Sequence, residues 1–118
     1  MVHGNKNRKF GRSRSQRTAL VRGLAISLIE NGAIKTTEAK AKELRPFVER
    51  LVSRGKENTV AARRIVASRL GEPNADVIKK VFDVIAPKFA TRAGGYTRVI
   101  KMGRTLAGRD EAVIEFVE

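Results

Sequence analysis

The residue types that carry most acid–base and metal chemistry are scarce in this sequence. Its 118 residues contain one histidine, His3, and no cysteine. A thiolate metal site and a disulfide are therefore excluded, and His3 fits a nucleic-acid contact better than a catalytic role. We expect no catalytic residue, no metal site, no cofactor and no small-molecule substrate.

A glycine pair lies between two arginines in the segment RAGGYTR, residues 92–98. The segment lacks the Gly-Lys-Ser/Thr ending of a nucleotide-binding P-loop, so nucleotide hydrolysis is not indicated. Paired glycines can let backbone amides approach a phosphate, with the Tyr96 ring available to stack. The alternative is an ordinary turn before a strand, with Tyr96 in the core. Spacing alone favours neither interpretation, and the surrounding positive charge favours phosphate.

The net charge of +13 is carried by two segments that contain no Asp or Glu. Residues 1–29 hold seven Lys or Arg and residues 86–109 hold six, while the rest of the chain balances twelve basic with twelve acidic residues. A surface built only for solubility intersperses charges of both signs. The segregation therefore indicates two segments that lie against the phosphates of a nucleic acid.

Residues 1–13 contain one large apolar residue, Phe10, and are predicted to form a basic extended arm. Ser13 or Ser15 can cap a helix that runs to about Asn31 and stops at Gly32. A short strand is expected at 33–37. The apolar stripe of this helix recurs at 3.6-residue spacing and consists of Leu20, Val21, Leu24, Ala25, Leu28 and Ile29.

The clearest helix begins after its cap, Thr37, and is expected to end before Gly55. Pro46 lies in its middle and should kink it near Arg45 or start a separate helix there. Its apolar stripe consists of Leu44, Phe47, Val48, Leu51 and Val52.

Two further helices and two strands complete the prediction. Asn58 or Thr59 caps a helix to Leu70, Asn74 caps another that Pro87 ends, and strands follow at 96–102 and 111–117. Ala112, Ile114 and Phe116 share one face of the last strand. We therefore expect an α+β (α/β) fold in which one globular domain, residues 14–118, packs four helices on a small three-stranded sheet.

Several segments in this order resemble the bacterial large-subunit ribosomal protein L-seventeen family across essentially the whole chain. They are the arm with His3, RTALVR at 17–22, IKTTEAKAKELR at 34–45, PKFATRAGGYTRV at 87–99 and IEFV at 114–117. The resemblance implies a three-stranded sheet and a structural protein of the cytoplasmic large subunit. It also implies binding to large-subunit rRNA near the outer side of the peptide exit tunnel, beside neighbouring large-subunit proteins.

Lys35, Thr36 and Thr37 lie just before a helix start, whose free amides favour an anion, although spacing alone favours simple capping. The candidate rRNA-binding residues come from these positions, the basic segments and a pair of central arginines. They are His3, Asn5, Lys6, Arg8, Lys9, Arg12, Arg14, Arg17, Arg22, Lys35, Thr36, Thr37, Arg63, Arg64, Lys88, Arg92, Gly94, Gly95, Tyr96 and Arg98. Two positions depart from the family pattern: Val2 stands where Arg is usual and Gln16 where His is usual.

Two other function classes stay open from the residues alone. A DNA-architectural protein would also be small, basic and cysteine-free, although it should show a recognition helix or a β-ribbon arm. An RNA-processing enzyme is poorly served by one histidine and by carboxylates that lie outside both basic segments. No membrane partner is expected, because no apolar run approaches the roughly 20 residues that span a bilayer.

Overall fold

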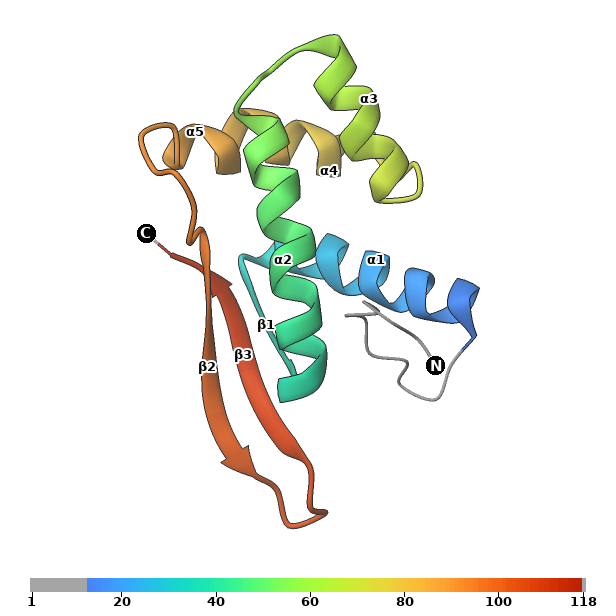
Figure 1. The fold of residues 1–118 in the computed structure, drawn as a ribbon, viewed down its shortest axis with the longest axis vertical. Helices are drawn as coiled ribbons and strands as arrows, with labels where there is room; N and C mark the ends of the chain where they lie inside the picture. Colours follow the sequence, from blue (N-terminus) through green and yellow to red (C-terminus); the bar gives the residue numbers. More distant parts are fainter. Residues whose placement is uncertain (1–12, 118) are drawn as a thin grey trace, which may run out of the picture.

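The computed structural model describes residues 13–117, and residues 1–12 and 118 lie outside the described residues. The elements are α1 (Arg14–Asn31), β1 (Ala33–Thr37), α2 (Glu38–Gly55), α3 (Val60–Arg69), α4 (Ala75–Lys80), the π-helical turn η1 (Val81–Ile85), α5 (Ala86–Lys88), β2 (Thr97–Arg104) and β3 (Asp110–Phe116). Because α4, η1 and α5 follow one another without a break, they form one helical run (Figure 1). The predicted α+β fold with four helices and three strands is confirmed, while the predicted arm falls almost entirely outside the described residues.

A capping box starts α1. The backbone N–H of Gln16 donates to Ser13 Oγ at 3.3 Å, and the N–H of Ser13 donates to Gln16 Oε1 at 3.1 Å. Two N–H groups that the first helical turn leaves free are thus satisfied. Gln16, one of the two departures from the family pattern, therefore has a structural role here. Gly32 ends the helix at φ 81°, as predicted.

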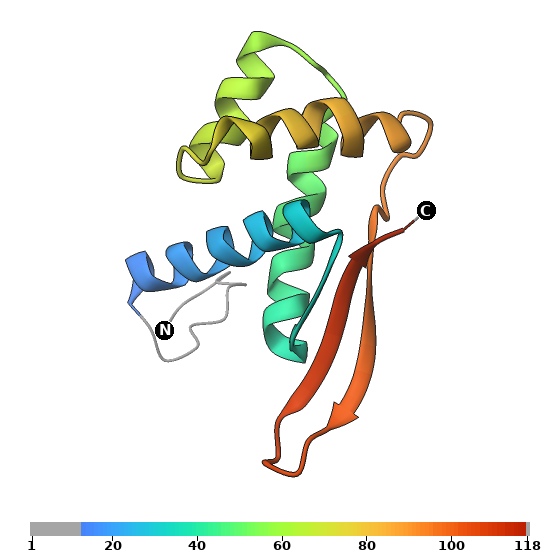
Figure 2. The same cartoon turned by 180° about the vertical axis from the view of Figure 1, so that it is seen from behind.

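Helix α2 lies at the centre of the fold. It contacts all three strands on one side, and α1, α3 and the helical run elsewhere on its surface (Figures 1 and 2). Gly55 is its last residue rather than the residue after its end, and a Cβ there would lie 3.0 Å from the Cβ of Ala86. Glycine thus permits the close approach of α2 to the helical run. The fully buried side chains of α2 are Ala41, Leu44, Val48, Leu51 and Val52.

Two of the three prolines, Pro46 and Pro87, lie inside helices. Pro46 is accommodated within a continuous α2, so the separate helix considered from the sequence is not formed. Pro87 was expected to end the fourth helix, but the helical run continues to Lys88. The π-helical turn directly before it has Ala86 N–H donating to the carbonyl of Val81, five residues back. This wider turn suits a following proline, which lacks an N–H and would crowd a regular α-helical turn.

The sheet has the strand order β1-β3-β2, and both pairs are antiparallel. Ala112 and Ile114 are fully buried and Phe116 is half-buried against the same core, so the predicted shared face is confirmed. Strand β2 runs two residues further than predicted, through a bulge between Lys101 and Gly103. The β2–β3 hairpin projects beyond the helices (Figure 1).

The carboxylate of Glu49 in α2 fastens the loop that leads into β2. Its Oε1 accepts the N–H of Gly95 at 3.2 Å, and its Oε2 accepts the N–H and the hydroxyl of Thr97 at 3.2 and 2.9 Å. Arg45 Nε approaches Oε2 at 3.4 Å from one helical turn away. The side chain of Glu49 is only 22% exposed, so these bonds are shielded from water.

The pKa of Glu49 lies below its ordinary value. Burial raises this pKa, but the hydrogen bonds from Thr97, Arg45 and Gly95 to the charged carboxylate together outweigh burial. A carboxyl group whose pKa is lower in the folded state stabilises the fold above the pKa it has in the unfolded chain. We therefore expect this stabilisation to be full above about pH 4.5 and to fade as the pH falls through the lowered folded-state pKa.

Glu49→Gln is expected to lower the free energy of unfolding at pH 7 by about 1–3 kcal/mol, because an amide has one acceptor oxygen and its NH₂ faces N–H donors. Urea unfolding of both proteins from pH 7 to pH 3 measures this, and the gap between them should narrow as Glu49 protonates. Glu57→Gln is the control, since its 52% exposed carboxylate makes only a surface ion pair with Arg54. A Glu49 variant as stable as that control would contradict the prediction.

Candidate nucleic-acid interface

Two hollows meet on the surface of α2. One, of about 590 Å³, lies between the first half of α1, the middle of α2 and the end of α3. The other, of about 410 Å³, continues between α2 and α3. Both are lined by Phe47, Arg50 and Arg69, so they form one continuous depression. α1 and α3 extend to the same side of α2 (Figure 1), and residues of all three helices line the first hollow.

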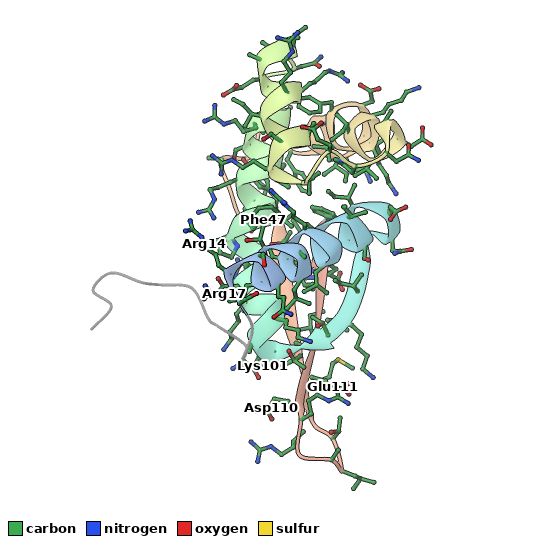
Figure 3. The ribbon with its side chains drawn as sticks, turned by 90° about the vertical axis from the view of Figure 1, so that its right-hand side faces the viewer. Arg14, Arg17, Phe47, Lys101, Asp110 and Glu111 are labelled. Carbon is green, nitrogen blue, oxygen red and sulfur yellow. The ribbon has the colours of Figure 1, made fainter. Side chains whose placement is uncertain are left out.

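Six arginines line these two hollows, which we call the arginine groove. They are Arg14, Arg17 and Arg22 of α1, Arg50 and Arg54 of α2, and Arg69 of α3. Only two carboxylates, Glu43 and Glu57, are among the lining residues, so the groove has an excess of positive charge. Figure 3 shows Arg14 and Arg17 on the same side of the molecule as Phe47. A concave surface of one sign concentrates the field and attracts a polyanion.

Arg22 also holds the groove together. Its Nε donates to the carbonyl of Arg69 at 3.0 Å, and its Nη2 reaches the carbonyl of Ser68 at 3.5 Å. These carbonyls lie at the C-terminal end of α3, where a helix leaves acceptors free and favours a cation. A Cβ on Gly71 would lie 3.2 Å from Arg22 Cδ, so the glycine after α3 leaves room for this contact. The predicted RNA-contacting residue Arg22 therefore also positions α3.

Three groove arginines were not predicted from the sequence, namely Arg50, Arg54 and Arg69. They belong to the middle of the chain, where basic and acidic residues balance. The net charge of this segment therefore does not reveal a local cluster of arginines. A local signal existed, because Phe47, Arg50 and Arg54 follow the i, i+3, i+7 spacing of one helix face. That face borders the apolar stripe, and Phe47 was assigned wholly to the core although it is half-buried and lines the groove.

The glycine pair does not offer all its amides to a phosphate. Glu49 already accepts the N–H groups of Gly95 and Thr97, so an internal carboxylate occupies the position considered for a phosphate. Tyr96 is 1% exposed, its hydroxyl bonds Ser53 and Lys56, and its ring packs 5.1 Å from that of Phe89. The ring is therefore a core residue and is not available to stack on a base. Gly94 is half-buried, and its carbonyl accepts Arg92 Nε at 3.1 Å.

Basic side chains around this loop remain on the surface. Lys88 and Arg92 are exposed, and Arg98 is exposed while bonding Glu115 Oε2 at 2.8 Å. Lys56 crosses beneath the loop and donates to the carbonyl of Arg92 at 2.6 Å. The second basic segment thus presents cations from a loop that is fixed to α2 at two points.

The other predicted site residues are not lining residues of the groove. Lys35 pairs with Glu111 at 3.4 Å on the sheet, Thr36 is half-buried, and Thr37 Oγ1 accepts the N–H of Lys40 as the cap of α2. The predicted cap at Thr37 is thereby confirmed. Arg63 bonds Asn58 and Asp83 and lies over the Phe82 ring, while its neighbour Arg64 is exposed. His3, Asn5, Lys6, Arg8, Lys9 and Arg12 lie outside the described residues.

The acidic strand β3 is neutralised by its neighbours. Glu111 pairs with Lys35 of β1, Glu115 with Arg98 of β2, and Asp110 with Arg104 at 3.1 Å. The hydrogen bond from Arg104 lowers the pKa of Asp110, which keeps this pair charged. In Figure 3, Lys101, Asp110 and Glu111 lie below Arg14 and Arg17, towards the end of the β2–β3 hairpin.

The described residues contain neither a group of side chains arranged for a metal nor a helix suited to span a membrane. No group of three or more His, Cys, Asp or Glu side chains within residues 13–117 is arranged to hold a metal ion. Over the same residues, no helix is long and apolar enough to cross a membrane.

Known proteins resemble this chain over nearly its whole length. The family described as "Ribosomal protein L17", the L-seventeen family, matches residues 20–117. Proteins named "Large ribosomal subunit protein bL17" from Gemmatimonas aurantiaca and Persephonella marina are 49% and 50% identical to it, covering 99% and 100% of this chain and 98% and 96% of theirs. One from an Exiguobacterium species is 51% identical and covers 92% of this chain and 97% of its own. The chain therefore belongs to the ribosomal protein L-seventeen family, a family of ribosomal proteins rather than enzymes.

Proposed function

We propose that this chain is a structural component of the cytoplasmic large ribosomal subunit and binds large-subunit rRNA through the arginine groove. Its relatives carry the name of a large-subunit protein. The observation that supports an RNA contact at this place is the convergence of six arginines from three helices on one groove. The proposed location is near the outer side of the peptide exit tunnel, beside neighbouring large-subunit proteins, as the resemblance implies.

Contacts to phosphate account for this arrangement better than contacts to base edges. The bases of an A-form helix lie in a deep, narrow groove that side chains cannot enter, so arginines bind its phosphates and 2′-hydroxyls. Guanidinium groups suit this task because each can donate two parallel hydrogen bonds to one phosphate. Binding of this kind depends on RNA shape, and it weakens steeply with salt because the release of counterions from the RNA becomes less favourable as the salt concentration rises.

Two further basic surfaces extend the proposed contact. Residues 1–12 supply four Lys or Arg that a chain of this length can carry up to roughly 40 Å from the domain. Lys88 at the end of α5, Arg92 in the loop fastened by Glu49 and Arg98 at the start of β2 supply a second surface. With the groove, these surfaces would hold adjoining segments of the rRNA without any catalytic step.

The double variant Arg17→Gln and Arg50→Gln tests the groove. It removes one charge from each side of the groove without touching the bonds of Arg22. The slope of the logarithm of the binding constant against the logarithm of salt concentration should fall by about one for each arginine. Filter binding of the full chain to large-subunit rRNA from low to high salt measures this slope.

The matched control for that variant is Lys42→Gln with Lys79→Gln, which removes the same charge outside the groove. Its slope should stay near that of the unchanged protein. Equal effects of the two double variants would contradict a binding site in the groove.

In density gradients at moderate salt the unchanged protein should sediment with large subunits, whereas sedimentation with DNA would favour the architectural alternative.

Deleting residues 1–12 tests the arm. Loss of four Lys or Arg should lower the same salt slope by about three to four if each contacts a phosphate. The unfolding midpoint in urea should not change, since α1 keeps its cap at Ser13. A slope equal to that of the full chain would show that the arm does not contribute to binding.

Arg92→Ala together with Arg98→Ala tests the second surface. Binding to large-subunit rRNA should weaken, with a salt slope lower by about two. Stability should change by less than about 1 kcal/mol, because the ion pair of Arg98 with Glu115 lies at the surface. Unchanged affinity in the filter assay would exclude this loop from the contact.

A further inference from the structure

The arginine groove has an aromatic and apolar floor. Phe47 lies where the two hollows join, Pro46 and Val21 line one hollow beside it, and Ile65 and Leu51 line the other. Binding the outside of an RNA duplex needs charge and hydrogen-bond donors, but it does not need an apolar floor. The floor therefore indicates that something other than phosphate enters the groove.

Positive charge lies on both sides of Phe47. Arg14 and Arg17 belong to one hollow, Arg54 belongs to the other, and Arg50 and Arg69 line both. An RNA strand that crosses the groove would thus have cations for the phosphates before and after the ring. The nucleotide between those phosphates would lie directly over Phe47.

We infer that the groove receives a single unpaired nucleotide, which leaves its rRNA helix and stacks its base on Phe47. This inference rests on the proposed function, because it assigns the class of RNA that the same groove binds. A base within a regular A-form helix is stacked on its neighbours and cannot reach a side chain on the floor of a groove. Only a bulged or looped nucleotide combines a free base face with two flanking phosphates.

The size and rigidity of the site suit such a nucleotide. Volumes of about 590 and 410 Å³ lie within the range of roughly 300–1,000 Å³ typical of small-ligand sites. Phe47 is half-buried against the hydrophobic core, so its ring is held in place before the RNA arrives. A fixed platform avoids the entropy that binding would otherwise cost to order a side chain.

Charge complementarity selects RNA over an apolar protein segment. A protein helix or strand packed on Phe47 would bury the surrounding arginines without an anion for each, and an unpaired buried charge is strongly unfavourable. A nucleotide brings its own negative charges next to its apolar base face. Base stacking on an aromatic side chain also tolerates any base, so no particular base is required.

The test uses the full chain bound to large-subunit rRNA and two probes. Hydroxyl-radical cleavage reports which backbone segments the protein covers, and acylation of 2′-hydroxyls reports which nucleotides are mobile. We expect one unpaired nucleotide within the covered region to react in free rRNA, to be protected by the unchanged protein and to react again with Phe47→Leu. The same variant should bind about 5-fold or more weakly, as expected from loss of aromatic stacking.

Two control variants separate this inference from the proposed function. Phe47→Tyr keeps an aromatic ring and should keep the protected nucleotide, whereas Arg17→Gln with Arg50→Gln should reduce backbone coverage over the whole groove. The urea midpoint of Phe47→Leu checks that the core is intact. If Phe47→Leu leaves both acylation and affinity unchanged while the arginine variant loses coverage, the inference fails and the proposed function stands. If the arginine variant loses no coverage, both fail.

Discussion

The structure depends on one constraint, which is that a single helix must be buried on two sides. α2 packs against all three strands and also against α1, α3 and the helical run. Ala41, Leu44 and Val48 fill one side, and Gly55 lets the helical run approach closely at the other end. The half-buried Phe47 and the exposed Arg50 and Arg54 of α2 line the groove, together with residues of α1 and α3. The same packing that builds the core therefore builds the candidate site.

The balance of internal charges decides which surfaces are free to bind a polyanion. On the sheet, Glu111 and Glu115 are paired with basic side chains of the adjacent strands, which leaves that face near neutrality. In the loop before β2, Glu49 takes the amides that would otherwise attract an anion. The groove has six arginines against two carboxylates, so a local excess of positive charge remains there. Carboxylates thus limit the binding surface, because they pair with the cations of the sheet and with the loop amides that could otherwise bind an anion.

The sequence allowed the elements to be predicted well, because caps and periodicity are local. Ser13, Thr37, Thr59 and Asn74 each cap the helix expected of them, and the three strands occur where β-branched residues cluster. The prediction from sequence was wrong where tertiary packing overrode a local sequence rule. Pro87 follows a π-helical turn in a helical run whose Val81, Phe82 and Ile85 are buried in the core. The site was harder to predict, because Arg50, Arg54 and Arg69 become neighbours of Arg17 only when three helices pack together.

RAGGYTR shows why a motif alone does not define a site. Its glycines do bring backbone amides towards an anion, as the pattern indicates, but the anion is the carboxylate of Glu49, which is distant in sequence. Carboxylate and phosphate oxygens both accept hydrogen bonds from N–H groups. Residue types alone therefore cannot distinguish an internal contact with a carboxylate from a ligand-binding site. The contact with Glu49 nevertheless serves binding, because it holds in place the loop that carries Arg92 and leads to Arg98. Preorganised cations lose less entropy on binding than cations on a free loop. The internal contact made by Glu49 therefore favours binding at the neighbouring basic surface, although it occupies the position that the sequence offered to a phosphate.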